Sequence, residues 1–274
     1  MSLKLPNQFY ADRSRGVRYK LEQQFLNKIV HFTNTELYPA LEVLIQRKTF
    51  QKDPTKFAQK MKDLEKELTQ RIFSLADKHI KDILKVNLSD NFEGSWFKVP
   101  DKAIDENYNS LILQSKYKKN IETIISRTFG LLTNRFFLIT ESRLSKKIVE
   151  ELMKTLKDTM RSSISRIQRL TYTNTTLAVN RGREIQFRQR DPNNTYRYKW
   201  QTVPDKRRTP QCEQIVLRVE ADMRRTGDKG VTLSRLKQIV TEVANLPQFR
   251  KSNPNIDWTP HYNCRSTIRR SFGN

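Results

Sequence analysis

The sequence predicts a mainly α protein, in which a region of long helices is followed by a smaller α+β module at the C-terminal end. Three observations predict this class. Apolar residues recur at three- and four-residue steps through most of the chain, and there are only 7 glycines among 274 residues. After about Arg188 the pattern changes to strand-like alternation. We therefore expect a helical region over residues 1–150 and a C-terminal module over residues 151–274.

The N-terminal region begins with two amphipathic helices. Apolar residues between positions 19 and 50 fall on one helical face, which predicts one long helix that bends at Pro39. Asp53 before Pro54 is typical of a helix start, with Asp as the N-cap and Pro at the first helical position. The apolar periodicity then continues to Leu84. We expect the two helices to pack as an antiparallel pair.

Two more helices are expected after an interruption at residues 87–102, where Gly94 and Pro100 favour a loop. The third helix runs through residues 121–132 and the fourth through residues 142–190. The fourth helix bridges the two predicted regions.

The C-terminal module should open with a turn and a strand. Residues 191–194 read Asp-Pro-Asn-Asn, a turn signal, and residues 195–203 alternate as a strand does. The aromatic residues of this strand share one face and are expected in the core: Tyr196, Tyr198 and Trp200. The basic residues Arg197 and Lys199 share the other face. A helix over 212–223, a loop with Gly227 and Gly230, a helix over 233–243 and a proline-bearing tail complete the module.

The charge of the chain implies a polyanionic partner. Lys and Arg number 52 against 29 Asp and Glu, for a formal net charge of +23. Nucleic acid is the first candidate, because each neutralised phosphate releases counterions and adds affinity without sequence preference. An anionic membrane surface is the second candidate, and solvated lysine faces are a third explanation. No stretch approaches the roughly 18 to 20 apolar residues of a spanning helix, so we expect no membrane anchor.

Basic residues interleaved with aromatic ones form a candidate DNA-binding set, because such runs pair with phosphates. The set is Arg188, Arg190, Arg197, Lys199, Lys206, Arg207 and Arg208.

A set of short motifs is spaced along roughly the last 110 residues of the chain. They include Arg166-Ile167, Asn180-Arg181-Gly182, a Lys-Trp-Gln-Thr strand at 199–202 and a Pro-His-Tyr-Asn-Cys-Arg-Ser-Thr run at 260–267. Over roughly residues 155–270 this order resembles the phage Mu F-like minor head protein family, also called the phage head morphogenesis family. The residues that carry the resemblance most directly are Trp200, Asp205, Arg208, Thr209, Cys212, His261, Asn263, Cys264, Arg265 and Ser266.

The chain also departs from the family pattern. Residues 172–174 read Tyr-Thr-Asn where many members have Arg-Thr-Glu, and Pro210 stands where some members have a first Cys. The spacing from Asp205 to Arg208 is one residue longer than the common one.

The resemblance implies a minor capsid protein inside the virion head, at the portal vertex, that is made in the host cytoplasm. The amphipathic helices of residues 1–150 offer a surface for docking on the portal or major capsid protein. The charge excess predicts nonspecific binding of double-stranded DNA. The sequence contains no Gly-rich phosphate loop, no His-Glu-x-x-His motif and no evident paired-carboxylate motif, so we expect no enzyme. The alternative is a nucleic-acid-acting enzyme, a nuclease or toxin-like effector, with Asp205, Arg208 and His261 as candidate residues.

Cys212, His261 and Cys264 form a second candidate site, since they are ligand types that zinc prefers. The pattern lacks a fourth ligand, which Asp205 or Glu213 could supply. We favour a packed, hydrogen-bonded cluster without a cofactor that ties the tail to the turn at Asp205, and zinc binding stays open as the alternative. Both hypotheses require the three side chains to meet in space.

Overall fold

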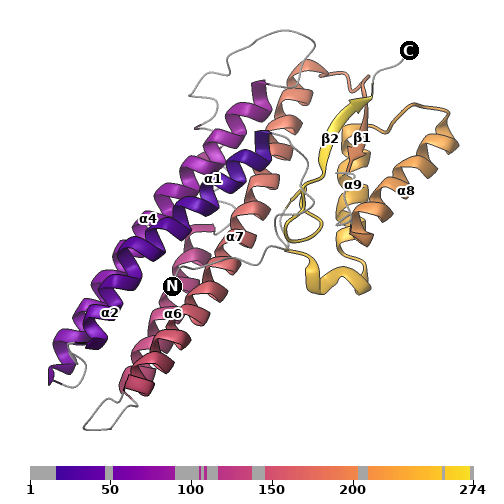
Figure 1. The fold of residues 1–274 in the computed structure, drawn as a ribbon. Helices are drawn as coiled ribbons and strands as arrows, with labels where there is room; N and C mark the ends of the chain where they lie inside the picture. The colour runs from indigo at the N-terminus through magenta and orange to yellow at the C-terminus, as the bar shows by residue number, and fades with distance from the viewer. Residues whose placement is uncertain are drawn as a thin grey trace. The chain divides into compact units, whose positions relative to one another are not determined.

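A computed structural model describes residues 17–46, 52–89, 105, 108–109, 117–137, 146–202, 209–254 and 257–271. The fold is mainly α with a small antiparallel sheet near the C-terminal end, which confirms the predicted class (Figure 1). The chain forms two compact units, one built on Glu22–His79 and Lys116–Gln168, the other on Ile80–Ser115 and Arg169–Asn274. The units divide within the long helix α7, Lys146–Arg190, which runs unbroken past residue 150. Separate roles for residues 1–150 and 151–274 stay a prediction.

The first predicted helix contains a π-helical turn just before Pro39. Helix α1 spans Val17–Phe32 and α2 spans Tyr38–Gln46, and a π-helical turn, Thr33–Leu37, joins them. In that turn the backbone N–H of Tyr38 donates to the carbonyl of Thr33, five residues back. Pro39 has no N–H and its ring crowds the carbonyl four residues back, so regular α-helical hydrogen bonding is disturbed in the turn before Pro39.

Helix α4, Pro54–Ser89, begins as predicted, because Asp53 Oδ1 accepts the backbone N–H of Lys56 at 2.9 Å. Its pairing with α1 is antiparallel. Phe25 stacks on His79 with ring centroids 4.8 Å apart, whereas Phe32, later in α1, lies under Arg71, earlier in α4. The helix extends through the first residues of the predicted loop at 87–102, and residues 90–102 lie outside the described part of the chain.

Helix α6, Tyr117–Phe137, and the first part of α7 complete this unit, where helices were expected at 121–132 and 142–190. Their buried apolar residues recur at one-turn spacing, as an amphipathic core face requires. They include Ile121, Ile125, Phe129 and Leu132 on α6, and Leu156, Met160, Ile164 and Ile167 on α7. Within the described residues, no helix combines the length and the apolar character of a membrane-spanning segment.

The second unit contains the sheet. Strand β1, Arg197–Gln201, lies inside the predicted strand at 195–203 and pairs antiparallel with β2, Thr267–Ser271, so that Trp200 stands opposite Ile268. The proline-bearing tail supplies this second strand, which was not predicted. Tyr198 and Trp200 are buried, as predicted, and Tyr196 is half-buried.

Helices α8, Pro210–Thr226, and α9, Leu233–Ala244, pack on the strands where helices were predicted (Figure 1). Thr209 caps α8, and Gly227 ends it in the left-handed conformation at φ 74°. Gly230 then passes so close to β1 that a Cβ placed there would lie 2.8 Å from the carbonyl oxygen of Tyr198. One apolar core joins these elements, with Ile215 of α8, Leu236 and Ile239 of α9, and Trp258 and Cys264 of the tail.

Candidate functional site

A buried polar stripe on α7 organises the site. Thr173, Thr176, Asn180 and Glu184 recur at three- and four-residue steps, so they share one face of the helix, and all four are buried. Buried polar groups are costly unless they are hydrogen-bonded. The tail, residues 257–271, supplies the partners of this stripe.

Asn180 makes the most contacts with the tail. Its Nδ2 donates to the carbonyls of Ser266 at 3.1 Å and Trp258 at 3.3 Å, and its Oδ1 accepts the backbone N–H of Ile268 at 3.1 Å. The side chain therefore fixes both ends of the segment that leads into β2.

Two threonines hold the middle of the same segment. Thr173 Oγ1 accepts the backbone N–H of Asn263 at 3.1 Å, and Thr176 Oγ1 donates to the carbonyl of Cys264. Asn263 adopts the left-handed conformation, with φ at 59°. Together these bonds fix the turn that carries His261 and Cys264.

Glu184 closes the stripe with a charged contact. Its carboxylate accepts the indole N–H of Trp258 at 2.6 Å, an Arg188 guanidinium bond at 3.0 Å and the Lys237 ammonium at 3.2 Å. Burial raises the pKa of Glu184, but the hydrogen bonds from Trp258 and Arg188 and the nearby charge of Lys237 outweigh burial, so the net pKa is lowered. Glu184 is therefore a buried carboxylate held in its charged form.

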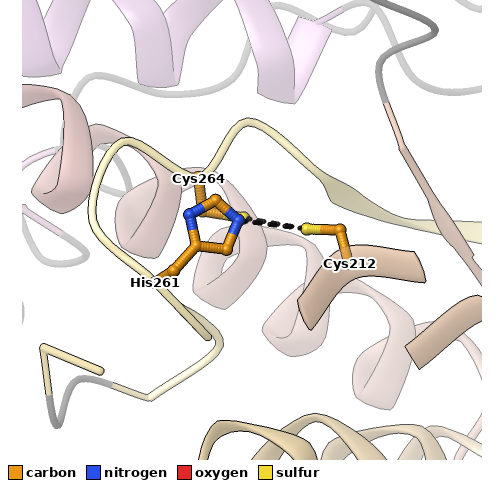
Figure 2. A group of neighbouring side chains, drawn as sticks. All are labelled: Cys212, His261 and Cys264. Atoms are coloured by element: carbon orange, nitrogen blue, oxygen red, sulfur yellow. Dashed lines mark hydrogen bonds between the residues drawn. The ribbon is translucent and has the colours of Figure 1, made fainter. Parts of the chain in front are cut away.

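The three side chains that the sequence predicted to meet, Cys212, His261 and Cys264, are together (Figure 2). Cys212 lies in the first turn of α8, where its backbone N–H is capped by Thr209 at 3.4 Å. Its Sγ is 3.2 Å from Nε2 of His261 and 3.9 Å from Sγ of Cys264. All three are buried, and Cys264 is 0% exposed.

The neighbours of the cluster fix its protonation. His261 Nδ1 lies 2.8 Å from the carbonyl oxygen of Tyr262, which can only accept, so Nδ1 carries a proton. The other ring nitrogen, Nε2, faces the Cys212 sulfur. The hydroxyl of Ser266 lies 3.1 Å from the Cys212 sulfur and adds a polar group on the same side.

Electrostatics favour charge separation within the cluster. The hydrogen bond with Cys264, followed by the bond and charge of His261, lowers the pKa of Cys212 although burial opposes it. Burial lowers the pKa of His261, but the hydrogen bond with Cys212 and the charge of Cys212 raise it by more, so the net pKa is raised. Burial raises the pKa of the Cys264 thiol. Such a cluster can bind a soft metal ion or hold a thiolate beside an imidazolium. To act as a nucleophile, Cys212 would have to be reached by a substrate, and its side chain is only 3% exposed.

The outer face of the two-stranded sheet is a second candidate site. In the antiparallel register Lys199 stands opposite Arg269 and Arg197 stands opposite Ser271. Within the described residues, neither Lys199 nor Arg269 has an acidic partner, whereas Arg197 pairs with Asp228 at 3.0 Å. We call Arg197, Lys199 and Arg269 the basic sheet face.

The other predicted DNA-binding residues fall into two groups. Arg188 and Arg190 are exposed in the last turn of α7, and Arg188 also pairs with Glu184. Residues 205–208, which hold Asp205, Lys206, Arg207 and Arg208, lie outside the described residues. The predicted tie between the tail and the Asp205 turn, and the enzyme hypothesis that combined Asp205 and Arg208 with His261, therefore stay predictions.

The remaining motif residues lie in the core, at a helix cap or in the tail turn. Trp200 is buried, Thr209 caps α8, Asn263 makes the tail turn and Arg265 is half-buried. Sequence reasoning missed Arg269, because β2 was not predicted, and missed the tail-binding role of Thr176 and Asn180. The sequence signals for that role were the polar run at 171–176 inside an amphipathic helix and the Asn180-Arg181-Gly182 motif.

Comparisons with protein-family models, with curated proteins and with solved structures found no match to this chain. The resemblance to phage head morphogenesis proteins therefore depends on the motif residues alone.

Proposed function

We propose that this chain is a structural protein of a phage head, a minor capsid protein that binds duplex DNA without sequence preference and docks on portal or major capsid protein. The net charge of +23 and the motif resemblance support the proposal. The observation that carries the DNA-binding part is the pair formed by Lys199 and Arg269 across the sheet.

Like charges directly opposite each other in a sheet destabilise the pairing of the strands. In the described part of the chain, no acidic side chain offsets this pair. A phosphate backbone would neutralise both cations at once and release its own counterions. Arg197, two residues from Lys199, lies on the same face and would extend the contact along the strand.

The chemistry of the basic sheet face favours nonspecific binding. Lysine is a flexible point charge, and contacts of lysine and arginine with phosphates position a protein on DNA without reading sequence. The aromatic residues of β1 that could stack on bases, Tyr198 and Trp200, are buried. The face therefore presents charge to the nucleic acid and keeps its aromatic rings in the core.

Docking on a capsid partner is the second part of the proposal, and it is supported by the resemblance and by the amphipathic helices of the first half. Residues 1–150 would supply the docking region. Phage heads assembled with and without this chain, compared for protein composition and DNA retention, test this part. Loss of the chain should change one or both, and heads identical in both respects would contradict a role in the head.

The DNA-binding part is tested with two double variants of equal charge. Lys199→Gln with Arg269→Gln removes two cations from the basic sheet face, and Lys60→Gln with Lys62→Gln removes two exposed cations from α4. The first variant should weaken duplex binding and reduce the slope of log affinity against log salt by about 2, because each lost phosphate contact removes about one unit. The α4 variant should stay near the wild type. Equal losses in both variants would show that total charge, and not this face, governs binding.

A further inference from the structure

We infer that Cys212, His261 and Cys264 form a zinc site that fastens the tail to the first turn of α8. The inference is independent of the proposed DNA binding, because none of the three residues belongs to the basic sheet face.

The distances between the ligand atoms suit a zinc ion. With bonds of about 2.3 Å to sulfur and 2.0–2.1 Å to nitrogen, two ligands of a tetrahedral zinc lie roughly 3.5–3.8 Å apart. Here the two sulfurs are 3.9 Å apart, Cys212 Sγ is 3.2 Å from His261 Nε2, and all three ligand atoms lie within 4.8 Å of one another. They approximate one triangular face of such a tetrahedron, and the longest side, at most 4.8 Å, has to shorten when the ion binds.

The orientation of His261 supports the same assignment. A histidine that binds a metal usually donates its other ring N–H to a carbonyl or carboxylate, which fixes the tautomer. The contact between His261 Nδ1 and the Tyr262 carbonyl at 2.8 Å provides this arrangement and leaves Nε2, the nitrogen that would bind the metal, on the side of the sulfurs. Figure 2 shows the imidazole ring beside both cysteines, which come from separate segments of the chain.

The backbone that carries the ligands is fixed from outside the cluster. The N–H of Cys264 donates to the carbonyl of His261 at 3.3 Å, which closes the turn. The hydroxyl of Thr176 on α7 donates to the carbonyl of Cys264 and so attaches this turn to the helix. On the other side, the Thr209 cap fixes Cys212. A site held in this way loses little conformational entropy when a metal binds.

Asp205, one of the fourth ligands considered from the sequence, lies outside the described residues; among the described residues, an oxygen near Ser266 is placed to take the fourth position. Its hydroxyl lies 3.1 Å from the Cys212 sulfur and the residue is buried, so the hydroxyl or a water bound to it can complete the set. Glu213, the neighbour of Cys212, is exposed and does not belong to the group of potential ligands in the described residues. Because the cluster is buried, the site is structural in character, and zinc would link α8 to a tail segment far away in sequence.

The test uses the full chain, purified under reducing conditions, with Zn²⁺ and Co²⁺ as probes. Metal analysis should give about one zinc per chain after incubation with zinc and gel filtration, and Co²⁺ should produce a thiolate-to-cobalt absorption band with tetrahedral ligand-field bands. Cys212→Ser and Cys264→Ser should each weaken the thiolate band. His31→Gln, at an exposed histidine in α1, should leave the metal content and spectrum unchanged.

Three results would overturn the site. One is a reduced wild-type chain that takes up no zinc and gives no thiolate-to-cobalt band. Another is equal metal binding in the wild type and both cysteine variants, which would place the metal elsewhere. The third is a Cys212–Cys264 disulfide that persists in reducing buffer. If the cysteine variants do not fold, the wild-type cobalt spectrum still decides, because the thiolate band requires cysteine ligands.

Discussion

The side-chain oxygen of Asn180, within α7, accepts the backbone N–H of Ile268 in β2 at 3.1 Å. This bond joins a helix to the tail strand, and the amide nitrogen of the same Asn180 satisfies two tail carbonyls. The attachment of the tail to α7 thus depends on a side chain that is fully buried and uses both of its polar atoms.

Replacing Asn180 by Ala should destabilise the second unit by about 3 kcal/mol. The change leaves a buried N–H and two buried carbonyls without this partner, and each unsatisfied group costs roughly 1 to 3 kcal/mol. Denaturant unfolding monitored by tryptophan fluorescence measures the loss, since Trp200 and Trp258 lie in this core. Gln189→Ala, at an exposed position of the same helix, is the control. Equal stability of the two variants would show that Asn180 does not hold the tail.

Two glycine substitutions should act in opposite directions. Gly230→Ala should destabilise by roughly 1 to 3 kcal/mol, because its Cβ would meet the backbone oxygen and nitrogen of Tyr198 at 2.8 and 3.0 Å. Gly130→Ala in α6 meets nothing within 4 Å and should stabilise by about 0.5 to 1 kcal/mol, as expected for alanine in place of glycine in a helix. Thermal unfolding compares them, and a stabilising Gly230→Ala would refute the close approach of β1.

The stabilising effect of Glu184 should depend on pH. Its folded-state pKa lies below its ordinary value of about 4.3, so its charged form stabilises the fold fully above that value. The stabilisation is lost as pH falls through the lowered folded-state pKa. Wild type should therefore exceed Glu184→Gln in unfolding free energy at neutral pH, and the difference should shrink on acidification below about pH 4. Glu150→Gln in the same helix is the matched control, and a pH-independent difference at Glu184 would contradict its charged role.

Local signals made much of the fold predictable. The N-cap and first-turn proline at Asp53-Pro54 place the start of α4 correctly, because capping depends on neighbouring residues alone. The alternation around Tyr198 and Trp200 likewise predicts both β1 and its buried face. The meeting of Cys212 with His261 and Cys264 was predicted from the motif resemblance together with their chemistry as zinc-ligand types.

Features that depend on distant partners were not predictable in the same way. Strand β2 contains one apolar residue, Ile268, in its five positions, so its identity depends on pairing with β1. Thr176 and Asn180 have weak helix propensity, and their value appears only when the tail supplies hydrogen-bond partners. The π-helical turn before Pro39 was not predicted, because the sequence signalled only that the proline would disturb the helix and not the form that the disturbance takes.

The most direct test of the proposed function is the affinity of the full chain for duplex DNA as a function of salt, measured with two duplexes of unrelated sequence. We predict that log affinity falls linearly with log salt, with the same steep slope for both duplexes, because counterion release from phosphates drives the binding. Affinity that does not change with salt between roughly 50 and 200 mM, or that strongly favours one sequence, would contradict a nonspecific electrostatic mode.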